Sequence, residues 1–66
     1  MGPTIRKLRE ECGLTQEELA RKSGVSRGTI SAIELNAQKT TTTKTLEKIA
    51  TALNTTVDRF FYVGGV

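Results

Sequence analysis

The chain has 66 residues, of which 36% are apolar, and a net charge of +3 at pH 7. This length is near the lower limit for a domain that folds without disulfides or metal. One cysteine and no histidine exclude an internal disulfide and argue against a zinc site, so we expect no metal and no cofactor. No apolar run approaches the roughly 18 residues of a membrane span, and the N-terminus lacks a signal-peptide pattern. We therefore expect a cytoplasmic protein with no membrane partner.

The first expected element is a helix over residues 3–12. Ile5, Leu8 and Cys12 recur at helical spacing and predict a buried stripe. In that stripe we expect Cys12 to be a buried structural thiol rather than a redox switch. Gly13 is expected to end the helix in the left-handed conformation.

Two further helices are expected over residues 15–23 and 26–35, on either side of Gly24. Thr15 and Glu18 have the spacing of a capping box at the start of the first of them. Gly24 lies where a turn between the two helices requires a positive φ. A short turn with glycine between two short helices is typical of a helix-turn-helix unit.

The remaining residues predict two more helices. A run of four threonines favours a loop, because their β-branched, hydroxyl-bearing side chains prefer caps to helix interiors. Apolar residues then recur at helical spacing over residues 42–53, and a short last helix is expected over residues 56–61. The expected fold is all-α: one compact domain of five helices spanning residues 1–66, with a core over about 4–62 and a tail at 63–66.

The stretch LTQEELARKSGVSRGTISAIELN, residues 14–36, resembles the helix-turn-helix of the Cro and lambda-repressor-like DNA-binding domains, also called the xenobiotic-response-element family. The matching positions are Gln16, Leu19, Ala20, Gly24, Val25, Ile30, Ile33 and Glu34. The resemblance extends over about residues 5–61, nearly the whole chain. It implies a five-helix fold and a transcriptional regulator, here a repressor, that binds double-stranded DNA sequence-specifically by occupying its operator.

The outward face of the third helix agrees with this expectation. It is small and carries a single charge, that of Arg27, whereas solvated helix faces usually carry Glu and Lys. Such a face can approach the major groove closely, and Arg27 can contact guanine with two hydrogen bonds. By resemblance, the base-contacting residues are Arg27, Gly28, Ser31 and Ala32. The expected DNA backbone contacts are Gln16, Ser26, Thr29, Lys39, Thr40 and Thr42, although the threonine run could equally be a loop without contacts.

Arg9 and Glu34 form a candidate structural salt bridge. Arg9 follows Ile5 by four residues and Glu34 follows Ile30 by four, so each edges the buried stripe of its helix. Opposite charges on two inward-leaning edges favour pairing, and the resemblance implies the same pair. The alternative is two independent surface charges.

The segment RFFYV, residues 59–63, places three aromatic side chains in a very short helix that can bury one or two of them. The rest would form an exposed apolar patch, which is common at interfaces. We therefore predict a homodimer through Phe61, Tyr62 and Val63, and hence a near-palindromic operator.

Other functions stay open at this point. The same fold occurs in antitoxins of toxin–antitoxin pairs, whose main partner is a protein, and in controller proteins of restriction–modification systems. An enzyme is not expected, because histidine is absent, the serines have no recognisable base and no glycine-rich phosphate loop is present. We accordingly expect no catalytic residue and no small-molecule ligand.

Overall fold

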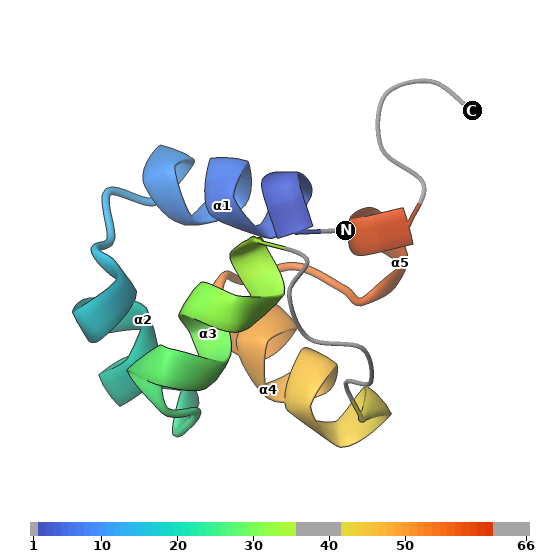
Figure 1. Ribbon diagram of the computed structural model, residues 1–66. Helices are drawn as coiled ribbons and strands as arrows, with labels where there is room; N and C mark the ends of the chain where they lie inside the picture. The colour runs from blue at the N-terminus through green and yellow to red at the C-terminus, as the bar shows by residue number, and fades with distance from the viewer. Residues whose placement is uncertain (1, 36–41, 62–66) are drawn as a thin grey trace.

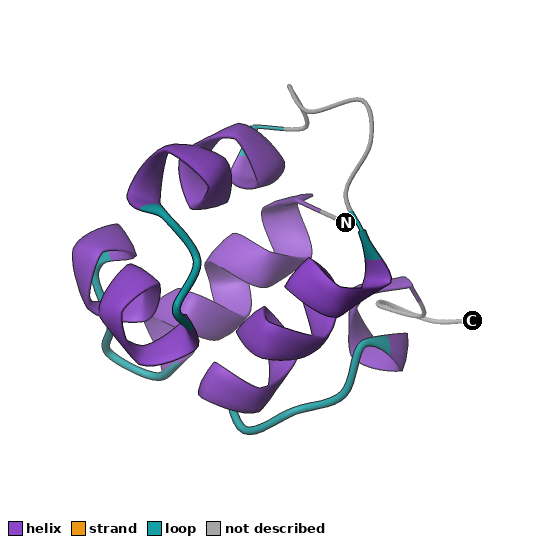
Figure 2. Ribbon diagram, turned by 90° about the horizontal axis from the view of Figure 1, so that it is seen from below, coloured by secondary structure: helices purple, strands orange, loops and turns teal. Residues whose placement is uncertain are grey.

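The computed structural model describes residues 2–35 and 42–61 (Figure 1). Within these residues the chain is all-helical, without strands, which confirms the predicted all-α fold (Figure 2). None of the described helices is long and apolar enough to cross a membrane. The five helices are α1 (Gly2–Glu11), α2 (Gln16–Ser23), α3 (Arg27–Glu34), α4 (Thr43–Ala52) and α5 (Asp58–Phe61).

The helices pack in a fixed set of pairs. In Figure 1, α1 crosses above α3, α2 lies to the left of α3, and α4 lies below. Helix α2 packs on both α3 and α4, while α1 packs on α3 and α5. This arrangement leaves one side of α3 uncovered by the other helices.

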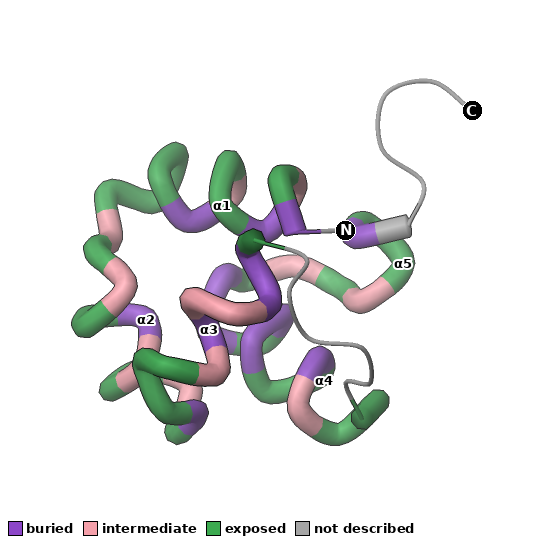
Figure 3. Tube along the Cα trace, in the orientation of Figure 1, coloured by how far each residue is buried: buried purple, intermediate pink, exposed green. Residues whose placement is uncertain are grey.

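The core lies where these helices meet. Figure 3 shows the buried stretches of α1, α3 and α4 facing the middle of the molecule. Every apolar side chain that is fully removed from water contributes about 1.5–3 kcal/mol to folding. The largest fully buried side chains are Ile5, Leu19, Ile30, Ile33, Ile49 and Phe60. Phe60 comes from α5, a four-residue helix, and so ties the end of the described chain to the core.

The exposure of Cys12 differs from the prediction. Cys12 is exposed, so the buried stripe expected over Ile5, Leu8 and Cys12 is wrong at its last position. Helix α1 ends one residue before Cys12, and Gly13 follows with a φ of 73°, as predicted. The buried side of α1 instead runs from Ile5 to Arg9, because the guanidinium of Arg9 finds partners inside the molecule.

Helix α2 begins with the predicted capping box. The Thr15 hydroxyl accepts a hydrogen bond from the Glu18 N–H at 3.1 Å, and the Glu18 carboxylate accepts one from the Thr15 N–H at 2.8 Å. The hydrogen bond from the Thr15 backbone is the main reason why the pKa of the Glu18 carboxyl lies below its usual value. A hydrogen bond with the Thr15 side chain lowers this pKa further. Two of the N–H groups that the start of α2 leaves without a helical partner are thereby satisfied.

We expect the contribution of Glu18 to stability to depend on pH. Because its folded-state pKa is depressed, the contribution is present above the usual glutamate pKa of about 4.3 and is lost as pH falls through the folded-state pKa. Melting temperatures of wild type and Glu18→Ala, measured at several pH values, should differ at neutral pH and converge in acid. Glu47→Ala, which removes an exposed carboxylate from α4, is the control for lost charge. A difference for Glu18→Ala that persists unchanged into acid would contradict the assignment.

The turn between α2 and α3 is held by local hydrogen bonds. Gly24 has a φ of 76°, and its N–H donates to the Ala20 carbonyl oxygen at 2.9 Å. The Ser23 hydroxyl accepts a hydrogen bond from the Val25 N–H at 3.2 Å. Val25 is then buried in the core, so the turn fixes where α3 begins.

Gly24→Ala should lower the free energy of unfolding by about 1–2 kcal/mol, because an L side chain is disfavoured at this positive φ. A Cβ at this position would meet no atom within 4 Å, so the loss would come from backbone strain and not from a clash. Gly28→Ala is the matched control: Gly28 is helical with open space around it, and alanine favours helix by about 0.5–1 kcal/mol. Urea unfolding of both variants should therefore show shifts of opposite sign. Shifts of the same sign would contradict this explanation.

Candidate nucleic-acid interface

The uncovered side of α3 carries the residues predicted to contact bases. Arg27 and Gly28 are exposed, and Ser31 and Ala32 are half-buried. Leu35, directly after α3, is 73% exposed. This face therefore offers one guanidinium, small side chains and one apolar side chain, with no carboxylate of its own.

Leu35 was not among the predicted site residues. It follows Ser31 by four residues, so helical spacing already placed it on the outward face. Its large exposed apolar surface is a signal that the sequence alone does not supply, because the neighbours of a side chain depend on how the helices pack.

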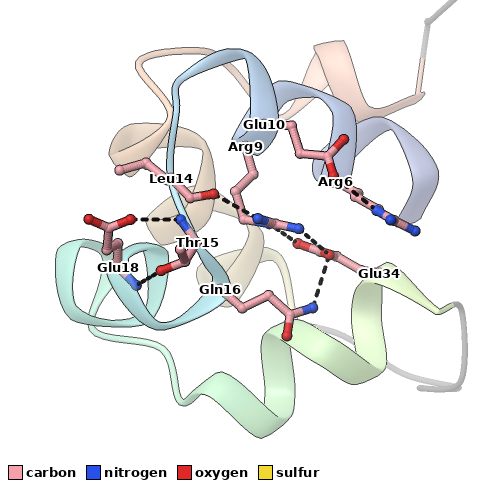
Figure 4. A network of polar contacts seen from close by, with 8 residues as sticks. All are labelled: Arg6, Arg9, Glu10, Leu14, Thr15, Gln16, Glu18 and Glu34. Carbon is pink, nitrogen blue, oxygen red and sulfur yellow. Dashed lines mark hydrogen bonds and ion pairs between the residues drawn. The ribbon is translucent and has the colours of Figure 1, made fainter.

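A buried ion pair lies behind this face (Figure 4). Arg9 Nε donates to Glu34 Oε2 at 2.8 Å, and Arg9 Nη2 donates to Glu34 Oε1 at 3.2 Å. The two side chains are only 11% and 3% exposed. The hydrogen bond to Glu34 raises the pKa of the Arg9 guanidinium above its usual value, although burial lowers it. The structure thus pairs the two residues with the two-bond geometry that makes arginine–carboxylate pairs strong.

Further hydrogen bonds extend this pair to α2. Arg9 Nη1 donates to the Leu14 carbonyl oxygen at 2.7 Å, just before the start of α2. Gln16 Nε2 donates to Glu34 Oε1 at 3.1 Å. One network thereby joins α1, the N-terminus of α2 and the C-terminus of α3 (Figure 4). It fixes Gln16, a predicted phosphate contact, relative to the outward face of α3.

Three of the hydroxyls predicted to contact the DNA backbone lie at helix starts. Ser26 is the N-cap of α3, and its Oγ accepts a hydrogen bond from the Thr29 N–H at 3.2 Å and donates to Thr29 Oγ1 at 2.8 Å. Thr42 is the N-cap of α4 and accepts a hydrogen bond from the Thr45 N–H at 3.2 Å. Ser26 and Thr42 are exposed and Thr29 is half-buried. Their capping bonds give these hydroxyls a structural role whether or not they contact DNA.

Other predicted residues fall outside the described part of the chain. They are Lys39 and Thr40, together with Tyr62, Val63 and the side chain of Phe61. Among the described residues, no group of three or more Cys, Asp or Glu side chains is placed to hold a metal ion.

A second ion pair, which sequence reasoning missed, lies at the start of α3. Arg27 Nη1 is 3.9 Å from Glu17 Oε1 on the first turn of α2. A shallow hollow of about 200 Å³ adjoins the pair. It is lined by Thr15, Gln16, Glu17 and Arg27. The hollow therefore lies between a predicted phosphate contact and the predicted guanine contact.

Two transcriptional regulators are similar to this chain in sequence. SinR of Bacillus subtilis, an HTH-type transcriptional regulator, is 37% identical over 57 residues, which are 86% of this chain and 51% of SinR. An uncharacterized HTH-type transcriptional regulator of Methanothermobacter thermautotrophicus is 59% identical over 34 residues, which are 52% of this chain and 49% of that protein. The chain thus spans about half the length of the curated relatives it matches.

Two solved structures are similar to the whole fold. A complex of SinR and SinI matches with a TM-score of 0.88 and 34% identity over 94% of this chain and 60% of that chain. The crystal structure of SinR, the master regulator for biofilm formation, in complex with DNA matches with a TM-score of 0.87 and 34% identity over 92% of this chain and 100% of that chain. The family model described as Helix-turn-helix matches residues 5–60. The chain therefore belongs to the helix-turn-helix family, in the Cro and lambda-repressor-like form that its sequence resembles.

Proposed function

We propose that this chain is a sequence-specific DNA-binding transcriptional regulator, not an enzyme, and that it represses by occupying an operator in the cytoplasm. The observation that carries the proposal is the uncovered face of α3, which presents Arg27 and small side chains and has no carboxylate. The similarity to SinR, whose structure is known in complex with DNA, supports the same class of partner.

The dimensions of α3 suit the major groove. An α-helix with its side chains is about 10–12 Å in diameter, and the major groove of B-DNA is about 12 Å wide. We propose that Arg27 reads a guanine while Gly28, Ser31 and Ala32 allow close approach, with Ala32 available to a thymine methyl group. Gln16 would hold a phosphate at the N-terminus of α2, where free N–H groups and the helix dipole favour an anion.

Two copies of the chain would act together. One α3 makes few base contacts, so useful specificity requires two half-sites, about 34–36 Å apart on a near-palindromic operator. We propose that Phe61, Tyr62 and Val63 form the homodimer interface, on the basis of the apolar sequence at that point. Sedimentation at micromolar concentration, with and without operator, tests this, and a strict monomer in both states would refute it.

The salt dependence of DNA binding tests the proposed function. Fluorescence anisotropy with a labelled random duplex should give an affinity that falls linearly on a log–log plot against salt, with a slope of about −0.9 for each phosphate contact. No measurable binding to any duplex at low salt would contradict the proposal.

A protein partner is the second candidate. The similarity to SinR in its complex with SinI favours this possibility. An antitoxin would also have a protein as its main partner, whereas a controller protein of a restriction–modification system would still be a DNA regulator. Purification of the tagged chain from its native host distinguishes an antitoxin from a DNA regulator. A toxin bound to the chain in stoichiometric amount would overturn our first proposal.

A further inference from the structure

The ion pair between Arg27 and Glu17 joins the two helices of the helix-turn-helix unit at its outer surface. Arg27 Nη1 and Glu17 Oε1 are 3.9 Å apart, and the side chains are 65% and 70% exposed. An ion pair so exposed and so long contributes little to stability and opens readily. Its position, and not its strength, makes it informative.

The ion pair engages Arg27, which is the one charged residue on the outward face of α3. Gly28, Ser31 and Ala32 are uncharged, so the state of Arg27 decides whether this face attracts phosphate. Glu17 places a carboxylate beside Gln16, at the edge of the hollow that adjoins Arg27. At this place a carboxylate interacts favourably with the helix dipole of α2, but it repels an approaching polyanion.

We propose that Glu17 is a specificity-determining residue, and this rests on the proposed function. On a preferred site, Arg27 leaves Glu17 for the O6 and N7 atoms of a guanine, and two hydrogen bonds offset the lost ion pair. On other sequences Arg27 stays with Glu17, so it does not act as a phosphate clamp on DNA of any sequence. Discrimination thereby gains from a repulsive element as well as from an attractive one.

The test uses Glu17→Gln, which keeps the size of the side chain and removes its charge. Dissociation constants are measured on a duplex selected from a random pool and on a scrambled duplex. We expect Glu17→Gln to strengthen binding to the scrambled duplex more than binding to the selected duplex. The ratio of the dissociation constant for the scrambled duplex to that for the selected duplex should therefore fall roughly two- to five-fold, the range that an exposed ion pair permits. Glu47→Gln, which makes the same change of charge on α4, should leave this ratio unchanged.

A double-mutant cycle assigns the effect to the pair. In an Arg27→Ala background, Glu17→Gln should not change the ratio, because no guanidinium remains to be released. An unchanged ratio for Glu17→Gln alone, or an equal fall in both backgrounds, would overturn the inference while leaving DNA binding intact. Absence of DNA binding by the wild-type chain would overturn the proposed function and this inference together. Thermal melts establish that each variant is folded.

Discussion

Arg9→Ala should lower the free energy of unfolding by about 3–5 kcal/mol, the loss expected when one partner of a buried ion pair is removed. Glu34 is buried, with its side chain 3% exposed, and among the described residues its carboxylate would keep a side-chain hydrogen bond only from the amide of Gln16. The bond from Arg9 to the Leu14 carbonyl oxygen would also be lost. For a domain this small, whose total stability is expected near the lower end of about 5–15 kcal/mol, this loss would remove most of the free energy of unfolding.

The exposed pair between Arg6 and Glu10 provides a matched control. It lies on the same helix, with an Nε–Oε2 distance of 3.3 Å, but its side chains are 62% and 56% exposed. Arg6→Ala should therefore change stability by no more than about 1 kcal/mol in the same urea titration. The account would be contradicted if Arg9→Ala shifted stability as little as Arg6→Ala does. The double variant Arg9→Met with Glu34→Leu should recover much of the loss, because apolar replacement of a buried pair leaves no charge unpaired.

Arg27→Ala should weaken binding to the preferred DNA site by about 1–3 kcal/mol and binding to scrambled DNA far less. Arg27 is exposed at the start of α3, and the other residues predicted to contact bases have no paired donor to offer a guanine. Discrimination between sequences should therefore be concentrated in this side chain.

Lys39→Ala provides the contrasting variant, since Lys39 is predicted to bind a phosphate. It should weaken binding to all DNA similarly and reduce the salt slope by about 1. Titrations of both variants over a salt series, on preferred and scrambled duplexes, separate the two roles. If Arg27→Ala weakens both duplexes equally, Arg27 contacts phosphate, and sequence must be read through Ser31, Thr29 or the shape of the DNA.

Local features of the fold could be predicted from the sequence because they follow short-range rules. The capping box of Thr15 and Glu18 and the left-handed Gly24 each depend on a few adjacent residues. The helix-turn-helix unit follows from these signals together with helical spacing. Arg9 and Glu34 could be paired because each lies four residues from a buried isoleucine on its own helix.

Features that depend on how helices meet were not predictable in this way. Cys12 fits a helical stripe, but α1 ends before it and Arg9 takes the buried position. The contact of Glu17 with Arg27 depends on the packing of α2 against α3, which no spacing within one helix reports. Helical spacing placed Leu35 on the outward face, but the extent of its exposure, 73%, depends on how the helices pack around it.

Selection of bound duplexes from a random DNA pool tests the central claim most directly. The account predicts enrichment of a near-palindromic motif whose half-sites contain a guanine and lie about 34–36 Å apart, one helical turn of DNA. Arg27→Ala, taken through the same selection, should lose the preference at that guanine while still recovering DNA. Wild-type chain that binds the pool but enriches no motif, or that binds no DNA at low salt, would contradict the claim that α3 reads DNA sequence.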